Sequence, residues 1–331
     1  MPILLTAWAN CRSVQPLSWY SRASPWFGCR PPLRILAARR VPVVRLDPGI
    51  DLYAGASLSA GYGTGEQGGL LRTPSRQLDL AHVRSVWVRR PSPYGGPPGL
   101  DEQDRRFAAA QHTWGTGGIL ASLPGAHYVN HPWRNRAAEH KAAQLAAAQR
   151  NGFLVPDTLI TTDEHEVQDF MARQVGTVVY KPLWSVPYRV DGQPRSVWVR
   201  EVNEDEITSA VAVCPHLFQA TVDKEFDVRV TAVSDRLFGT RIDSPDVDWR
   251  HRQDLMRCGP IAVPEAVADS IASYLGEFGL TYGAFDFAVT ADGRWYFLEC
   301  NPNGQWAWQP AETTDAIAHA ICDELQKDSD L

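Results

Sequence analysis

Two acidic residues near the end of the chain, Asp286 and Glu299, are spaced so that a β-hairpin would make them face each other. The pair Asp292-Gly293 separates the segments GAFDFAVTA and RWYFLECN, and this pair is favoured in two-residue type I′ turns. Counting outward from such a turn places Asp286 opposite Glu299. Two half-buried carboxylates in contact repel each other. A divalent cation bound between them would offset that cost.

Asn301 follows Glu299 by two residues, so the side-chain period of a strand places both on one face. Two carboxylates and an amide oxygen are hard ligands. They suit Mg²⁺ or Mn²⁺, with nucleotide phosphates completing the coordination. The alternative is that one carboxylate is exposed or pairs with one of the many arginines.

Lysine is scarce in this chain, which makes the position of each lysine informative. Lys181 lies in the middle of the apolar strand segment VVYKPL. A buried lysine either meets an anion or loses its proton, and phosphate is the obvious anion. Lys141 lies on an Ala-rich helical segment, where a surface lysine would be ordinary. Together with the acidic hairpin, the two lysines form a pattern typical of a phosphate site.

The remaining patterns predict an α/β (α+β) chain that positions these residues. Strands and helices alternate up to about residue 128, and a single helix is expected over 133–152, with Asn151 and Gly152 as its C-cap. A polar helix is expected over 163–174, a strand over 177–183, and two strands around the turn Asp191-Gly192. Residues 1–40 show no clear periodicity and are expected to be irregular, disordered or misassigned.

Composition excludes several classes of function. The net charge of −6 and the pI near 5.9 argue against nucleic acid as a partner. No apolar run reaches the length of a membrane span, and the first residues lack the charged region of a secretory signal. Six cysteines without a two-residue spacing indicate reduced thiols in the cytoplasm. GTGEQG, residues 63–68, matches a dinucleotide motif but precedes no helical pattern, so a flexible glycine loop is expected.

Several segments, taken in order, resemble the ATP-grasp superfamily: the helix with Lys141, then VVYKPL, QATVDKEFDVRV, RIDSPDVDWR and GAFDFAVTADGRWYFLECNPNGQW. More narrowly, they are similar to the ATP-grasp peptide maturases that crosslink graspetides, the microviridin-type peptides, including the actinobacterial TgmB-like group. The resemblance covers about residues 40–330. It implies an ATP-grasp fold after an N-terminal pre-ATP-grasp α/β domain, divided as 1–128, 129–215 with a lid, and 216–331 with the metal site.

The resemblance also implies roles for individual residues. Lys141 and Lys181 would contact the ATP phosphates, and Asp227 would meet the ribose. The hinge that reads adenine through backbone groups would consist of Gln219, Ala220, Thr221 and Val222. Relatives often carry Glu where this chain has Ala220, a change that a backbone contact tolerates. Arg229 and Arg250 would approach the phosphates or an acyl phosphate, and the metal ligands would be Asp286, Glu299 and Asn301.

The implied reaction activates an Asp or Glu side chain of a ribosomally made precursor peptide as an acyl phosphate. A Thr or Ser hydroxyl or a Lys amine of the peptide then displaces phosphate and closes a macrolactone or macrolactam. The expected cofactors are ATP and Mg²⁺ (or Mn²⁺), and a homodimer is expected. The leader of the peptide is expected to dock on the hairpin 184–202, at Tyr188, Arg189, Arg195, Trp198 and Arg200; the alternative is that this hairpin is only a lid over the nucleotide.

Two other functions remain open from the sequence. A RimK-like or glutathione-synthetase-like ligase that joins a free amino acid or small peptide would use the same ATP site. An inactive nucleotide-binding regulator would retain every motif named above. For Trp306 and Trp308 we expect core packing rather than substrate contact.

Overall fold

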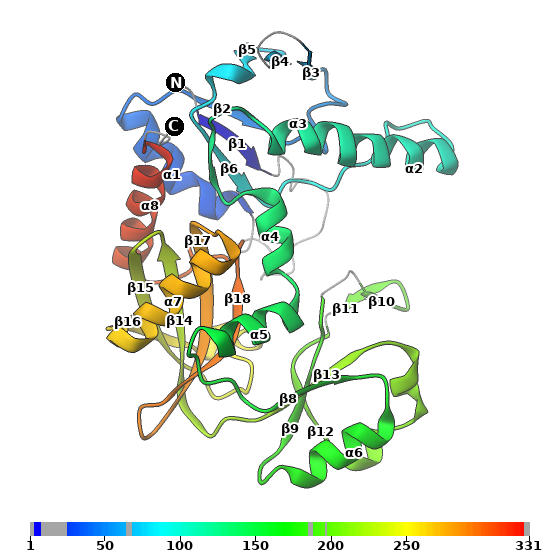
Figure 1. The fold of residues 1–331 in the computed structure, drawn as a ribbon, viewed down its shortest axis with the longest axis vertical. Coiled ribbons are helices and arrows are strands. Elements are labelled where there is room, and N and C mark those ends of the chain that lie inside the picture. Colours follow the sequence, from blue (N-terminus) through cyan, green and yellow to red (C-terminus); the bar gives the residue numbers. More distant parts are fainter. Residues whose placement is uncertain (1–2, 8–24, 64–67, 185–187, 196, 328–331) are drawn as a thin grey trace.

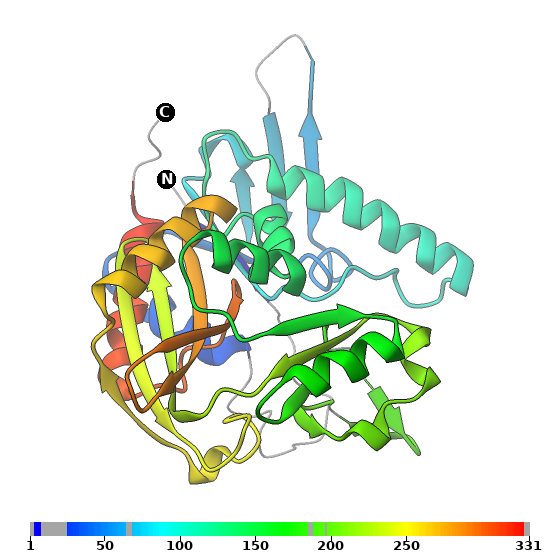
Figure 2. The same cartoon turned by 60° about the horizontal axis from the view of Figure 1, so that its bottom comes forward.

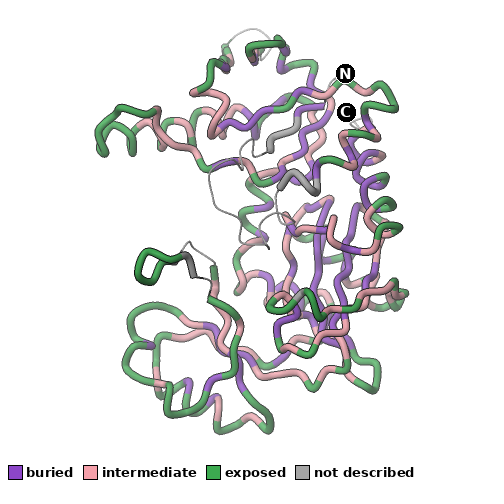
Figure 3. The backbone as a smooth tube through the Cα atoms, turned by 180° about the vertical axis from the view of Figure 1, so that it is seen from behind, coloured by how far each residue is buried: buried purple, intermediate pink, exposed green. Residues whose placement is uncertain are grey.

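The computed structural model describes residues 3–7, 25–63, 68–184, 188–195 and 197–327. Of the β-sheets in the described part, three have four or five strands, and they lie at the top, the lower left and the lower right of the view in Figure 1. Buried residues are concentrated in the N-terminal parallel sheet and in the five-stranded sheet formed within residues 224–301 (Figure 3). Among the described residues, no helix is long and apolar enough to cross a membrane.

The N-terminal sheet is parallel, with strand order β2-β1-β6-β7. Its strands are β1 (Ile3–Ala7), β2 (Val43–Leu46), β6 (Ser85–Arg89) and β7 (His127–Val129). Leu4 pairs with Val44 on one side and with Val86 on the other. The carboxyl ends of these strands therefore meet at one edge, where ligands of parallel sheets usually bind.

The expectation of an irregular segment over residues 1–40 is wrong for two parts of it. Ile3–Ala7 forms the strand β1 within the parallel sheet, and Pro25–Ala38 forms helix α1. The helix contains Pro31 and Pro32, which weaken a helical pattern. Its stability comes instead from tertiary packing, because Cys29 and Leu36 lie in one apolar core with helix α8 (Ala311–Leu325).

A small antiparallel sheet extends from the N-terminal part. It consists of β3 (Ser57–Gly61), β4 (Gly68–Thr73) and β5 (Arg76–Asp79). The GTGEQG motif thus leads into a strand rather than a helix, which confirms that it is no dinucleotide fingerprint; its residues 64–67 lie outside the described part. Next come α2 (Glu102–Gln111), the π-helical turn His112–Thr116 and α3 (Gly117–Ala121).

The central part holds the sheet β12-β9-β13-β8, with helix α6 (Glu164–Arg173) packed on one face (Figure 2). The strands are β8 (Thr158–Thr161), β9 (Val178–Lys181), β12 (Arg200–Val202) and β13 (His216–Ala220).

The predicted turn at Asp191-Gly192 is confirmed, since both residues have positive φ (50° and 74°). It joins only β10 (Tyr188–Val190) and β11 (Gln193–Arg195), while Arg200–Val202 pairs separately with β9. Short 3₁₀ turns span Leu80–His82, Glu204–Glu206, Ser209–Val213 and Gln253–Leu255.

The single helix predicted over 133–152 is two helices in the structure, α4 (Pro132–Ala138) and α5 (Lys141–Arg150). His140 between them is extended, with ψ 115°. Gln144 stabilises the break: its amide nitrogen donates to the carbonyl of Ala138, and its amide oxygen accepts from the backbone N–H of Cys300. The break starts a new helix at Lys141 and ties that helix to the strand carrying Glu299.

The C-terminal sheet is antiparallel, with order β16-β15-β14-β17-β18. Its strands are β14 (Lys224–Val233), β15 (Arg236–Asp243), β16 (Arg257–Ile261), β17 (Tyr282–Thr290) and β18 (Trp295–Asn301). Helices α5 and α7 (Glu265–Phe278) cover one face through a core that includes Tyr274, Phe285, Phe287 and Phe297. The polar residues of interest lie on the other face.

Candidate functional site

Asp286 and Glu299 are direct partners across β17 and β18, as the sequence predicts. The turn between the strands differs from the prediction: Gly293, with φ 81°, closes a three-residue connection between Thr290 and Arg294. One extra residue in the turn would shift the pairing by one position. A bulge at Leu298 shifts it back, because Phe287 pairs with Phe297 but Asp286 with Glu299.

The bulge has a second consequence for the site. Without it, Phe297 and Glu299 would lie on the same face, because side chains in a strand alternate. In the structure Phe297 is buried in the aromatic core, whereas Glu299 binds the cations described below. The bulge therefore turns Glu299 and Asn301 to the polar face while Cys300 returns to the core.

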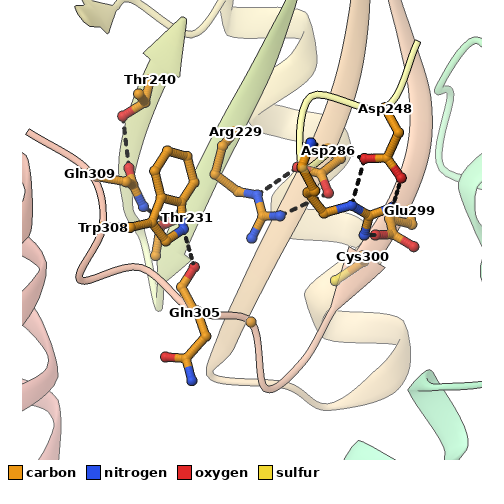
Figure 4. Close-up of polar contacts among 12 residues, drawn as sticks. Arg229, Thr231, Thr240, Asp248, Asp286, Glu299, Cys300, Gln305, Trp308 and Gln309 are labelled. Carbon is orange, nitrogen blue, oxygen red and sulfur yellow. Dashed lines mark hydrogen bonds and ion pairs between the residues drawn. The ribbon is translucent and has the colours of Figure 1, made fainter. Parts of the chain in front are cut away.

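Each of the two carboxylates is held by its own cations. Arg229 on β14 binds Asp286 with two hydrogen bonds, Nε to Oδ1 at 2.5 Å and Nη2 to Oδ2 at 2.8 Å. Glu299 accepts a short hydrogen bond from Lys141 and another from Nη1 of Arg250 at 3.1 Å. Arg250 also binds Asp248 through Nε at 2.8 Å and Nη2 at 3.0 Å. Arg229, Asp286, Asp248 and Glu299 thus converge on one region (Figure 4).

The pKa values of the two facing carboxylates shift in opposite directions. Burial raises the pKa of Asp286, although Arg229 counteracts this effect. Burial would also raise the pKa of Glu299, but the charges of Lys141 and Arg250 hold it well below its usual range. Glu299 is therefore a carboxylate at neutral pH, and the region depends on a balance of charges that a ligand would change.

Lys181 at the end of β9 faces the same region. Its Nζ donates to Oε1 of Gln219 at 2.5 Å. Burial lowers the pKa of Lys181 to about 8, while the nearby carboxylate of Glu299 raises it and Lys141 lowers it. Lys141 and Lys181 therefore lie close enough to influence each other's charge.

The expected adenine hinge begins on β13, the strand that pairs with the strand of Lys181. β13 carries Gln219 and ends at Ala220, and the backbone N–H of Thr221 bonds to the carbonyl of Thr177 at 2.9 Å. Gln219 is buried, and its amide nitrogen donates to Thr158 at 2.8 Å. The chain then passes Val222 into β14, which carries Asp227 and Arg229.

Asp227 is buried at the start of β14, and Lys224 covers it. The Lys224 Nζ binds Oδ2 of Asp227 at 2.6 Å and the carbonyl of Val247 at 2.8 Å. The other carboxylate oxygen, Oδ1, has no hydrogen-bond partner among the described residues. Burial raises the pKa of Asp227 to about 6, although Lys224 lowers it. An acceptor without a donor suits a ligand hydroxyl.

Sequence reasoning missed four residues of this region: Asp248, Lys224, Arg89 and Arg90. Lys224 is one of only four lysines, so the scarcity of lysine could have found it. Asp248 lies in the segment RIDSPDVDWR, where only Arg250 was singled out. Arg89 and Arg90 come from the N-terminal sheet and bind the carbonyl of Asn303. No local signal connects them with a loop more than two hundred positions away.

Asn301 lies on β18 opposite Ala284, and its side-chain oxygen accepts from the backbone N–H of Asn303 at 2.9 Å. The following loop is fixed to the sheet by Gln309, which donates to Thr231 at 2.9 Å and accepts from Thr240 at 2.7 Å (Figure 4). The loop thus holds Asn301 in place beside the two carboxylates.

The residues present fit a divalent cation that is shared with a polyanion. Asp286, Glu299 and Asn301 supply two carboxylates and one amide on one face. Among the described residues, no group of three or more His, Cys, Asp or Glu side chains suits a metal ion. Two carboxylates and one amide are too few ligands to bind the metal alone. Octahedral Mg²⁺ commonly takes its remaining ligands from phosphates and water. The surrounding lysines and arginines provide matching positive charge.

The two tryptophans of the final loop differ. Trp306 is 1% exposed in the core with α8, which confirms core packing. Trp308 is partly buried and packs against Trp249, with ring centroids 4.9 Å apart, and Trp249 lies under the Arg229 guanidinium. Trp308 is therefore a neighbour of the site rather than a core residue.

A cavity of about 800 Å³ opens beside the site, between strands β9, β12 and β13 and the loop 246–251. Trp198 and Arg200 line it, and Trp198 contacts His251 edge to face with centroids 5.9 Å apart. Arg189 bonds instead to the carbonyl of Gly192 in its own turn. The side chains of Tyr188 and Arg195 lie outside the described part. The structure thus brings two of the five expected peptide-binding residues together.

No protein-family model and no curated protein matches the chain. Solved structures do. A RiPP-associated ATP-grasp ligase from Chryseobacterium gregarium, in complex with ADP and a leader and core peptide, is 24% identical, with a TM-score of 0.85 over 98% of this chain and 96% of that one. The macrocyclase MdnC from Microcystis aeruginosa, bound with precursor peptide MdnA, is 25% identical, with a TM-score of 0.80 over 98% and 99%.

A more distant likeness is D-alanyl-alanine synthetase A from Vibrio cholerae, which is 13% identical, with a TM-score of 0.59 over 98% of this chain and 96% of that one. The predicted ATP-grasp fold is confirmed. The predicted resemblance to ATP-grasp peptide maturases is confirmed as well, since the similar structures are a RiPP-associated ATP-grasp ligase and a macrocyclase bound with its precursor peptide.

Proposed function

We propose that this chain is an ATP-dependent, ADP-producing ligase that crosslinks a ribosomally made precursor peptide. One observation carries the proposal: the facing carboxylates Asp286 and Glu299 are bracketed by cations from four different segments, Lys141, Arg229, Arg250 and, nearby, Lys181. Such an arrangement neutralises transferring phosphoryl groups.

ATP would bind between the central and C-terminal sheets. Lys141 and Lys181 would contact its phosphates, because both lysines are close to Glu299 and to each other. Gln219, Ala220, Thr221 and Val222 would read adenine through the backbone. The unpartnered Oδ1 of Asp227 supports its role as the acceptor for a ribose hydroxyl.

Asp286, Glu299 and Asn301 would hold Mg²⁺ or Mn²⁺. When bound, the cation supplies Lewis-acid stabilisation of the negative charge on the phosphates. Lys141 and Arg250, which bind Glu299 in this structure, would then be available for the phosphates. Arg229 keeps Asp286 oriented through its two hydrogen bonds.

The reaction would have two steps. An oxygen of a substrate Asp or Glu carboxylate attacks the γ-phosphorus of ATP, and the bond from that phosphorus to the ADP oxygen breaks. A Thr or Ser hydroxyl or a Lys amine then attacks the acyl carbon, releases phosphate and loses its proton. Arg229 and Arg250 would stabilise charge on the transferred group in both steps.

The similar ligases from Chryseobacterium and Microcystis were solved with leader or precursor peptides, which supports a precursor peptide as the partner here. We place the leader in the cavity lined by Trp198 and Arg200. The cavity is lined by apolar side chains, such as Val211 and Phe218, and by charged ones, such as Arg200 and Glu206, as an amphipathic peptide requires.

Three further features belong to the same proposal. The chain would divide into an N-terminal domain over 1–128, a central subdomain over 129–215 and a C-terminal subdomain over 216–331. It would form a homodimer. Because the reaction consumes ATP, it would take place in the cytoplasm.

Mass spectrometry of a short acidic peptide encoded beside this chain, co-expressed with and without it, tests the function. We expect the loss of one water mass per crosslink, abolished by Lys181→Ala. Unmodified peptide together with ADP release on free amino acids would indicate a small-molecule ligase instead. Neither activity would indicate an inactive nucleotide-binding protein.

A further inference from the structure

Arg89 is the last residue of strand β6 and Arg90 follows it, but the two side chains make different contacts. Arg89 is 2% exposed and donates to the carbonyl of Asn303 at 2.5 Å, the carbonyl of Gly304 at 3.2 Å and Oε1 of Gln305 at 2.6 Å. Arg90 is accessible to solvent and donates only through Nε, to the carbonyl of Asn303 at 3.2 Å. Among the described residues, neither terminal nitrogen of Arg90 has a partner.

The backbone of Arg90 is unusual for an arginine. Its φ is 46°, in the left-handed region that non-glycine residues rarely adopt. Such a conformation is strained for a residue with a Cβ atom, and it persists where the surroundings or a function require it. The strand ends at Arg89, so this conformation gives the Arg90 side chain a direction that a continued strand would not.

Arg229 is the arginine of the site whose positive charge acts on Arg90. Nε and Nη2 of Arg229 bind Asp286, while no hydrogen bond within the described part involves its Nη1. The loop Asn303–Gly304 connects the two arginines: Asn303 accepts from Arg90, and a Cβ on Gly304 would lie 3.2 Å from Nη1 of Arg229. Because Gly304 has no side chain, the loop can approach Arg229 closely.

The two guanidinium groups are close enough to repel each other. Reduced hydration within the surrounding protein, together with the positive charges of Arg89 and Arg229, lowers the pKa of Arg90 to about 10. Glu139 is the acidic residue near Arg90, but it is already paired with Arg136 at 3.5 Å. A cluster of cations with unused N–H donors implies an anion that is brought by a ligand.

We propose that Arg90 and Arg229 form a two-arginine clamp for the substrate carboxylate that becomes activated, with Arg90 as a specificity-determining residue. The inference rests on the proposed function and adds a substrate subsite to it. The cations assigned to the nucleotide come from α5 and β9, whereas Arg90 comes from the N-terminal sheet. Arg90 therefore reaches the site from a different part of the fold than the nucleotide lysines do. A guanidinium fork also matches the two oxygens of a carboxylate, which an ammonium does not.

Calorimetric binding of acetyl phosphate, a minimal acyl phosphate, to the Mg·ADP-loaded protein tests the clamp. We expect Arg90→Gln to weaken this binding by about tenfold or more while the affinity for Mg·ADP alone stays within about twofold. Arg90→Lys should also weaken binding, because lysine lacks the fork. Arg72→Gln, at an exposed arginine on β4, is the matched control and should change neither affinity.

The outcomes separate this inference from the proposed function. Unchanged acetyl phosphate binding in Arg90→Gln, or no binding by the wild-type protein, would overturn the clamp. Weaker Mg·ADP binding in Arg90→Gln would overturn it too, because it would show that Arg90 acts only by holding the loop of Asn301. If acetyl phosphate binding depends on Arg90 but no peptide is crosslinked, the clamp stands and the peptide substrate is wrong.

Discussion

Asp286 and Glu299 face each other across two strands, yet each carboxylate is neutralised from a different direction. Asp286 is bound by Arg229 of the neighbouring strand, and Glu299 by Lys141 of α5 and Arg250 of the loop after β15. The pair therefore joins three separate segments of the chain. Removing Asp286 would leave Arg229, and removing Glu299 would leave Lys141, without an acidic partner among the described residues. For a buried cation this costs several kcal/mol, by order of magnitude.

Glu299→Gln should lower ADP release by about two orders of magnitude or more, because it removes a metal ligand and the partner of two cations. Steady-state ADP release measured over a Mg²⁺ titration checks this, with Glu265→Gln, an exposed residue at the start of α7, as the control. Turnover and Mg²⁺ dependence like those of the wild type would remove Glu299 from the metal site.

Lys181→Met should abolish ATP turnover without destabilising the unliganded protein at pH 7. Burial lowers the pKa of Lys181 from 10.5 to about 8, so the fold disfavours its charge. For the wild type, the free energy of unfolding should therefore rise as pH rises from about 8 to about 10.5, and the variant should lack this rise. Urea unfolding of the wild type and of the variant at several pH values measures the free energy of unfolding. A wild-type profile that is flat over this range would contradict the assignment.

Trp198→Ala should weaken the binding of the precursor peptide by about tenfold, because an aromatic residue that lines an apolar cavity is a typical hot spot. Nucleotide affinity should not change. The KM for the peptide and the Kd for ADP separate the two effects. Trp114→Ala, at an 82% exposed tryptophan far along the chain from the cavity, is the control. Equal KM values for the two variants would show that the segment 184–202 is a lid only.

Asp227 should make nucleotide binding depend on pH. Its pKa is raised from 3.8 to about 6, so the fold favours the protonated form. The corresponding stability is present below pH 3.8 and is lost as pH rises through about 6. The carboxylate needed to accept from a ribose hydroxyl forms over the same range, so the affinity for ADP should rise with pH up to about 6 and then level off. Asp227→Asn should flatten both profiles; a variant with the wild-type pH dependence would exclude this role.

Glu324 on α8 should contribute to stability through two ion pairs. Its Oε1 lies 3.0 Å from Nε2 of His127, and its Oε2 lies 2.6 Å from Nζ of Lys327. Burial would raise the pKa of Glu324, but these two partners lower it below its usual 4.5. The stability is therefore present above pH 4.5 and is lost as pH falls below it. Glu324→Gln should lower the free energy of unfolding at pH 7 by about 2 kcal/mol. Chemical denaturation of this variant and of Glu312→Gln, in the exposed first turn of α8, provides the comparison; equal losses in both would contradict the role.

The hairpin shows how sequence reasoning can reach the right pair for an incomplete reason. Counting from a two-residue turn pairs Asp286 with Glu299, and the structure has this pairing. The turn is one residue longer than predicted, and the bulge at Leu298 compensates. A bulge is set by packing on both faces of a sheet, here Phe297 and Cys300 in the core and Glu299 outside it, so a count along one strand does not show it.

What the sequence alone determined is the chemistry of the site: which residues carry charge or oxygen ligands, their spacing on β17 and β18, and the unusual lysine in an apolar strand. These follow from local periodicity and residue type, which are readable in one segment at a time. Only the tertiary structure decided the partners. The strand and helix within residues 1–40, the break before Lys141, and the approach of Arg89 and Arg90 to the loop after Asn301 all depend on packing between distant segments. The free energy of that packing belongs to the folded chain as a whole and leaves no local pattern.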